Sequence, residues 1–167
     1  EVEKQPTIIY VMNESYWDVS ELEEHGFVFD TDVSANLHAL QQTSASGRAY
    51  SPSFGGGTCD VEFEALTGYS VSYLPNGSKP YQQHVTKPMF ALPNYLKTQG
   101  YQTAAIHCFW AKYWSRDTAY PNLGFDDFIS LEDMHHVQKV RKHYWTSGLV
   151  TDDTMADQII QQYETMK

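Results

Sequence analysis

The chain has 167 residues, of which 41% are apolar and 14% aromatic, enough to build one hydrophobic core. Its 11 Lys and Arg residues against 21 Asp and Glu residues give a formal net charge of −10. This balance argues against a nucleic-acid-binding protein, because neutralising phosphates requires clustered cations. The aromatic content argues against a disordered chain, and no stretch approaches the roughly 18 apolar residues that span a bilayer.

The N-terminal part of the sequence begins with a predicted strand. Residues 7–12 form a continuous β-branched and aromatic run, which is typical of a strand buried on both faces. Glu14 follows closely, and the carboxyl ends of strands are where open α/β sheets bind ligands. Residues 15–57 show no regular pattern apart from a short helix predicted over 35–42.

Three consecutive glycines at 55–57 precede the next predicted helix. Glycine permits a backbone with positive φ and a close approach to a ligand. Residues 60–66 show a helical pattern, so Thr58 is expected at a helix N-terminus, where the N–H groups and the helix dipole favour an anion. The apolar side of this helix is predicted to consist of Val61, Ala65 and Leu66.

The second half of the sequence continues the alternation of helices and strands. We predict, in chain order, turns over 67–83, an amphipathic helix over 90–99 closed by Gly100, a buried strand over 101–106 ending at His107, a turn and short strand over 123–129, and a helix over 151–166 capped by Thr151 or Asp152. This order predicts an α/β fold with a mostly parallel sheet flanked by helices. No repeat or linker marks a second domain.

Two residues suggest metal chemistry. A carboxylate at a strand end, Glu14, and a hydroxyl at a helix N-terminus, Thr58, could share one divalent cation that lowers the pKa of the hydroxyl. From the residues alone, the ordinary alternatives are a solvated loop carboxylate and a helix N-cap. The segment is not a phosphate-binding P-loop, because no Gly-Lys-Ser/Thr follows the glycines.

A second group of candidate residues consists of His107, Trp114 and Arg116. An arginine fork suits a phosphate or sulfate, and a neighbouring tryptophan can wall such a site. The alternatives are a core histidine, a packed tryptophan and a surface arginine. Cys59 and Cys108 lack the spacing of a zinc site, and we expect two isolated thiols, with a disulfide left open.

The sequence resembles a known family. Residues 11–18 and 54–68 are similar to the lipoteichoic acid synthase-like phosphoglycerol transferases, in the sulfatase branch of the alkaline phosphatase superfamily. Segments 74–83, 105–107 and 120–126 fit the same family, so the resemblance covers nearly the whole chain in order. It implies an alkaline phosphatase/sulfatase-like fold and the transfer of glycerol phosphate from phosphatidylglycerol to a cell-envelope polymer or glycolipid.

The resemblance also implies roles for individual residues. Thr58 would be the nucleophile and, with Glu14, a ligand of one divalent cation, most often Mn²⁺, with Mg²⁺ or Zn²⁺ as alternatives. His107, Trp114 and Arg116 would bind the phosphatidylglycerol head group. The family works on the extracellular face of the bacterial cell membrane, held by N-terminal membrane helices that this sequence does not contain.

The sequence departs from the family where the metal site should be completed. The family adds an Asp-His pair and a further substrate-contacting His, and neither is present, so most of the coordination shell would be left to water. We therefore expect residues 1–167 to be the truncated N-terminal portion of a catalytic domain, inactive without its C-terminal half. The alternatives are a non-catalytic anion-binding module and a sulfatase-like ester hydrolase. The latter is suggested by Cys59 beside Thr58, but the Cys-X-Pro/Ala-X-Arg context is missing.

Overall fold

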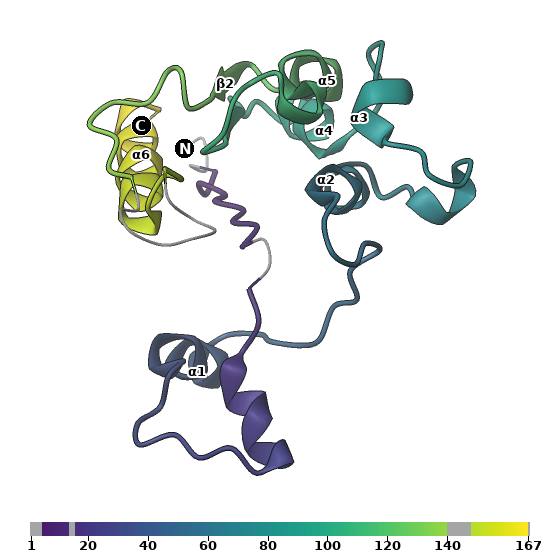
Figure 1. Cartoon of the computed structure of the whole chain (residues 1–167). Coiled ribbons are helices and arrows are strands. Elements are labelled where there is room, and N and C mark those ends of the chain that lie inside the picture. Colours follow the sequence, from purple (N-terminus) through teal and green to yellow (C-terminus); the bar gives the residue numbers. More distant parts are fainter. Residues whose placement is uncertain (1–4, 14–15, 140–147, 167) are drawn as a thin grey trace. The chain divides into compact units, whose positions relative to one another are not determined.

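A computed structural model describes residues 5–13, 16–139 and 148–166 of the chain (Figure 1). They belong to two compact units, which we call unit 1 (Glu1–Ser51) and unit 2 (Pro52–Lys167). Unit 1 contains the 3-10 helix η1 (Val19–His25) and α1 (Ala35–Thr43). Unit 2 contains α2 (Thr58–Thr67), η2 (Val71–Tyr73), α3 (Pro80–Gln83), α4 (Leu92–Thr98), β1 (Ala104–Ile106), η3 (Tyr113–Ser115), α5 (Arg116–Leu123), β2 (Asp127–Ile129) and α6 (Asp152–Thr165).

Unit 1 is built from two short helices that bury none of their residues. The η1 helix begins after Asp18, whose carboxylate accepts a hydrogen bond from the backbone N–H of Ser20. It ends at Gly26, which has the left-handed φ of 85° that glycine adopts without strain. The α1 helix confirms the helix predicted over 35–42.

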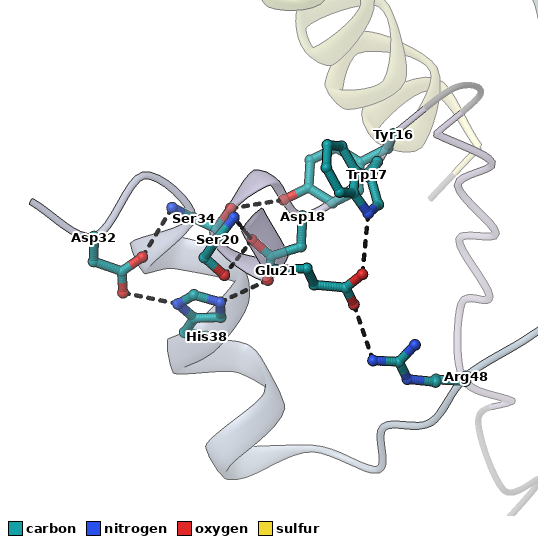
Figure 2. A network of polar contacts seen from close by, with 9 residues as sticks. All are labelled: Tyr16, Trp17, Asp18, Ser20, Glu21, Asp32, Ser34, His38 and Arg48. Carbon is teal, nitrogen blue, oxygen red and sulfur yellow. Dashed lines mark hydrogen bonds and ion pairs between the residues drawn. The ribbon is translucent and has the colours of Figure 1, made fainter. Parts of the chain in front are cut away.

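A polar network joins η1 to α1 (Figure 2). The imidazole of His38, on α1, lies between two carboxylates, with Nε2 2.7 Å from Asp18 Oδ2 and Nδ1 2.8 Å from Asp32 Oδ2. Both ring nitrogens can donate only when the imidazole is protonated. Hydrogen bonding to the two carboxylates raises the pKa of His38, and the same bonds hold the pKa values of both aspartates below their ordinary value.

Residues 7–12, predicted as a buried strand, form neither helix nor strand in this structure. The side chains from Ile8 to Val11 are each more than half exposed. A strand is stable when a neighbouring strand pairs with its N–H and C=O groups, and the described residues show no such pairing for this segment. The prediction is therefore wrong for this structure, and the run is left as an exposed apolar segment.

The sheet of unit 2 consists of two parallel strands among the described residues. Ala104 of β1 lies opposite Asp127 of β2, and Ile106 lies opposite Ile129. The connection between the strands carries η3 and α5, as a parallel pair requires. The structure thus confirms a parallel α/β arrangement with helices, and β1 occupies the second half of the strand predicted over 101–106.

The hydrophobic core of unit 2 is formed mainly by α2, α3 and α5 together with the segments beside them. Its buried members are Cys59, Phe63, Tyr81, Val85, Ala91, Ala119, Tyr120 and Leu123. The Tyr120 ring lies edge-on to two others, with ring centroids 5.8 Å from Tyr81 and 4.7 Å from Phe128. Fully burying a side chain such as Leu123 contributes about 1.5–3 kcal/mol relative to leaving it exposed.

Three helices of unit 2 agree with the sequence pattern, whereas η2 and α3 fall within residues 67–83, which the sequence predicts as turns. The helices predicted over 60–66, 90–99 and 151–166 correspond to α2, α4 and α6. Thr151 is the N-cap of α6, because its side chain accepts from the backbone N–H of Thr154. The sequence does not indicate α5, which contains a proline and starts immediately after residues with left-handed backbone. Among the described residues, no helix is both long and apolar enough to cross a membrane.

Candidate active site

Thr58 is the first residue of α2, at the end of the glycine run. Gly55, Gly56 and Gly57 have φ values of 73°, 125° and 88°, all in the left-handed region. The predicted position of Thr58 at a helix N-terminus is therefore confirmed. Partial positive charge at this helix end favours an anion near the half-buried threonine.

The φ of 88° at Gly57 favours glycine, and the ends of two charged side chains lie where a Cβ atom would be. A Cβ atom added there would lie 2.7 Å from Lys79 Nζ and 2.9 Å from Asp60 Oδ2. Real Cβ atoms do not approach other heavy atoms this closely, so the lysine and the aspartate pack directly on the backbone of Gly57. The residue before Thr58 is thus in contact with a pair of opposite charges.

Lys79 connects this loop to Trp114. Its Nζ donates to Asp60 Oδ2 over 2.8 Å and lies 5.3 Å from the centroid of the Trp114 ring, a cation–π distance. The hydrogen bond to Asp60 raises the pKa of Lys79, so the ammonium stays charged. A positive charge therefore lies between the glycine run and a residue that the family resemblance assigns to the head group.

Arg116 lies inside unit 2 and is only 1% exposed. Its Nε donates to Glu62 Oε2 over 3.1 Å, and its Nη2 donates to Glu62 Oε1. A third N–H, on Nη1, reaches the backbone carbonyl of Tyr113 over 3.1 Å. The hydroxyl of Tyr120 also donates to Glu62. The arginine fork thus joins α2 to the start of α5 through a buried carboxylate.

His107 follows β1 directly, as predicted, and its backbone N–H donates to the carbonyl of Ile129 over 2.9 Å. Burial, together with the smaller effect of the charge of Arg116, lowers its pKa to about 4, so the imidazole is neutral at pH 7. Its Nε2 is buried and has no hydrogen-bond partner among the described residues. Such an atom costs free energy unless a polar ligand satisfies it.

Trp114 packs against the core of unit 2 with a left-handed backbone. Its φ of 58° and the φ of 59° at Ser115 place two successive non-glycine residues in this region. Each such residue costs roughly 1–3 kcal/mol and persists only where surrounding packing holds it. Backbone strain therefore accumulates where the sequence predicts head-group binding.

The predicted metal ligand Glu14 lies outside the described residues. Within the described ranges, no group of three His, Cys, Asp or Glu side chains is placed to hold a metal ion. Thr58 supplies one oxygen, and a divalent cation needs several. The described residues therefore do not build a metal centre by themselves.

Contacts between side chains link three of the candidate site residues, Thr58, Trp114 and Arg116, through the α2 helix and Lys79. The α2 helix that begins with Thr58 carries Glu62, which pairs with Arg116, and the Lys79 ammonium bridges from Asp60 to Trp114. Sequence reasoning misses Glu62 and Lys79 as site residues. Glu62 lies one helical turn after Thr58, a spacing that indicates a shared face. The residues next to Lys79 in the sequence give no indication of its contacts with Asp60 and Trp114.

The buried face of α2 also differs from the prediction. Its buried residues are Cys59, Asp60, Glu62 and Phe63, whereas the expected apolar side at 61, 65 and 66 is only half-buried. Paired charges and hydrogen bonds make the polar burial tolerable. Neither Cys59 nor Cys108 is in a disulfide. Burial raises the pKa of the Cys59 thiol to about 12, which makes it a poor nucleophile.

Comparisons with known proteins show the family to which the chain belongs. A family model described as Sulfatase matches residues 6–166. A Rhizobium meliloti (strain 1021) protein named "Putative cyclic beta-1,2-glucan modification protein" is 36% identical over 163 residues. That match covers 98% of this chain and 24% of the relative, so the chain spans about a quarter of the curated relative's length.

Two solved structures share the fold. Streptococcus pyogenes phosphoglycerol transferase GacH, in complex with sn-glycerol-1-phosphate, is 26% identical with a TM-score of 0.63, over 78% of this chain and 34% of that chain. The lipoteichoic acid synthase LtaP from Listeria monocytogenes is 20% identical with a TM-score of 0.53, over 70% of this chain and 27% of that chain. Enzymes of this superfamily are hydrolases or transferases that use a divalent metal. The chain belongs to the sulfatase family, and it shares its fold with lipoteichoic acid synthase-like members of the alkaline phosphatase superfamily.

Proposed function

We propose that the protein carrying this chain is a phosphoglycerol transferase with Thr58 as its nucleophile. The observation that carries the proposal is the position of Thr58 at the N-terminus of α2, behind three left-handed glycines. The likeness to GacH, whose structure holds sn-glycerol-1-phosphate, supports glycerol phosphate as the transferred group. Phosphatidylglycerol is the proposed donor.

The reaction takes two steps. In the first, Thr58 Oγ1 attacks the phosphorus, the bond from phosphorus to the diacylglycerol oxygen breaks, and diacylglycerol leaves with the proton from the threonine. In the second, an acceptor hydroxyl attacks the phosphorus, the bond from phosphorus to Thr58 Oγ1 breaks, the proton of the acceptor passes to Oγ1, and glycerol phosphate is left on the acceptor. The N-terminus of α2 stabilises the negative charge on the phosphate in both steps.

His107, Trp114 and Arg116 are the proposed head-group residues. The neutral imidazole of His107 offers its unsatisfied Nε2 to a glycerol or phosphate oxygen, and the Trp114 ring walls the site. Arg116 directs three of its five N–H donors to Glu62 and Tyr113 and is only 1% exposed, so a head group would have to displace part of this buried contact to reach it. The other contribution of Arg116 is to hold α2 and α5 together.

The proposed metal is one Mn²⁺ ion, with Mg²⁺ or Zn²⁺ as alternatives. Glu14 and Thr58 would be its ligands from this chain, and an Asp-His pair from the C-terminal half of the domain would complete it. Bound there, a divalent cation supplies Lewis-acid stabilisation of the nucleophile and the phosphate. We expect these 167 residues to be inactive without that half.

The acceptor is proposed to be a cell-envelope carbohydrate on the extracellular face of the bacterial membrane. The name of the Rhizobium meliloti relative, which is 36% identical, favours a glucan hydroxyl within that class. A sulfatase-type hydrolase that uses Cys59 is disfavoured, because this thiol is 0% exposed and lies in the core. The non-catalytic alternative, an anion-binding module, predicts head-group binding without turnover.

The test uses the full-length protein with Mn²⁺, phosphatidylglycerol vesicles and cyclic β-1,2-glucan. We expect diacylglycerol release and transfer of labelled glycerol phosphate to the glucan, both lost in Thr58→Ala. Turnover that survives this substitution would contradict the proposal. Faster release from an aryl sulfate than from phosphatidylglycerol would favour the hydrolase, and binding of glycerol phosphate without release would favour the binding module.

A further inference from the structure

The Lys79–Asp60 ion pair differs from the Lys97–Asp126 pair, the other lysine ion pair found among the described residues of unit 2. The pair between Lys97 and Asp126 is open to solvent, with side chains 41% and 38% exposed. In the Lys79–Asp60 pair the exposed fractions are 30% and 12%, and Asp60 also accepts from the Cys59 thiol. Exposed pairs contribute little because water and salt screen them, and the Lys79–Asp60 pair is less exposed on both sides than the Lys97–Asp126 pair.

The Lys79–Asp60 pair rests on the backbone of Gly57. Both charged atoms lie within 3 Å of where a Cβ on that glycine would be. On its other side, the ammonium lies over the ring of Trp114. Lys79 comes from the start of α3, so it joins three segments that are distant in the sequence: the glycine run, α3 and η3.

Asp60 places a negative charge in the first turn of α2, beside Thr58. An incoming phosphodiester is also negative, and the chain as a whole has a net charge of −10. Without Lys79, the carboxylate of Asp60 would oppose the negative charge that the phosphate gains as Thr58 attacks, and it would lose the partner that holds it against Gly57. Removing Lys79 alone should therefore do more harm than removing both charges.

We propose that Lys79 is a positioning residue of the transfer reaction. Through Asp60 it holds Gly57 and hence Thr58 in place, it neutralises the carboxylate beside the nucleophile, and it ties both to Trp114. This inference rests on the proposed role of Thr58 as nucleophile. In this role Lys79 does not contact the phosphate. Its removal should therefore lower the rate of the chemical step and leave the affinity for the head group unchanged.

The test compares Lys79→Met, the double variant Lys79→Met/Asp60→Asn and the matched control Lys97→Met in the full-length protein. For diacylglycerol release from phosphatidylglycerol, Lys79→Met should lower kcat by about 100-fold, the scale of a small misplacement of reacting groups, with KM nearly unchanged. The double variant should recover about tenfold of that loss, and Lys97→Met should match the wild type.

Amide hydrogen exchange of the peptide covering residues 53–58 gives a readout independent of turnover. Exchange should become faster in Lys79→Met but not in Lys97→Met. Unchanged exchange and kcat in Lys79→Met would overturn the inference, and so would a loss confined to KM, which would make Lys79 a direct phosphate ligand. Wild-type turnover that persists in Thr58→Ala would instead refute the proposed nucleophile, and hydrogen exchange would still decide whether Lys79 holds the loop.

Discussion

Different interactions stabilise unit 1 and unit 2 internally. In unit 1, η1 and α1 bury none of their residues, and hydrogen bonds around His38 join them (Figure 2). Unit 2 has a cluster of buried apolar side chains and, in addition, a buried ion pair between Glu62 and Arg116. The stability of unit 1 therefore depends on protonation, whereas that of unit 2 depends mainly on buried area. The candidate nucleophile Thr58 begins α2, a helix that belongs to unit 2 and contributes to its core.

The largest effect is expected from breaking the buried ion pair of unit 2. Arg116→Met leaves the Glu62 carboxylate buried without its partner, which should cost about 3–5 kcal/mol of unfolding free energy. The double variant Arg116→Met/Glu62→Leu should lose much less, because it removes both charges. Urea denaturation measures the difference, and equal losses in the two proteins would contradict a charge-pair origin.

A matched pair of leucine truncations sharpens the contrast between the units. Leu123 in unit 2 is 0% exposed, so Leu123→Ala should lower the unfolding free energy by about 2–5 kcal/mol. Leu40 on α1 is 62% exposed, so the same truncation should stay within about 0.5 kcal/mol. Similar losses in urea denaturation would mean that unit 1 has an apolar core after all.

The pKa values of His38 and His107 are shifted in opposite directions from the ordinary value of a histidine. His38 has a raised pKa, so its contribution to stability is present below the ordinary value of 6.5 and is lost as pH rises through the folded-state pKa. His107 has a pKa lowered to about 4, so stability falls as pH drops from 6.5 towards 4, where the unfolded chain binds the proton more readily.

NMR titration of the two imidazoles checks both signs in one experiment. The His38 midpoint should lie above 6.5 in the wild type and should fall in Asp32→Asn, which removes one of its two carboxylate partners. The His107 midpoint should lie well below 6.5 and should not respond to that substitution. Two midpoints near 6.5 would contradict both environments.

The smallest effect is expected at the rim of the unit 1 network. Arg48 pairs with Glu21 over 3.1 Å, but its side chain is 82% exposed. Such pairs are screened by water and salt, so Arg48→Ala should change the unfolding free energy by less than about 0.5 kcal/mol. A larger loss in urea denaturation would show that the outer part of the network also holds the unit together.

The sequence predicts those features of the site that depend on neighbouring residues. The position of Thr58 follows from the glycines before it and the helical pattern after it, and His107 follows from the apolar run that it ends. The burial of Arg116 could not be predicted in this way, because Glu62 is 54 positions away in the sequence. The same holds for the contact of Lys79 with Gly57, which depends on how α3 packs beside α2.

The failed strand at residues 7–12 has a related cause. Its apolar run has the composition of a buried strand, but a strand also needs neighbours, and the described residues provide none for it. Local pattern therefore predicts helices such as α1, α2 and α6 well, since their hydrogen bonds lie within the segment. Strand pairing and buried ion pairs depend on residues far along the chain.

The central claim is that Thr58 carries the transferred group. The most direct measurement is mass spectrometry of the peptide containing Thr58, after the full-length protein has reacted with phosphatidylglycerol and Mn²⁺ and has been quenched in acid. The account predicts one glycerophosphoryl group on Thr58, formed without the glucan and removed when the glucan is added. An unmodified Thr58 in a protein that still releases diacylglycerol, with the same rate in Thr58→Ala, would contradict it.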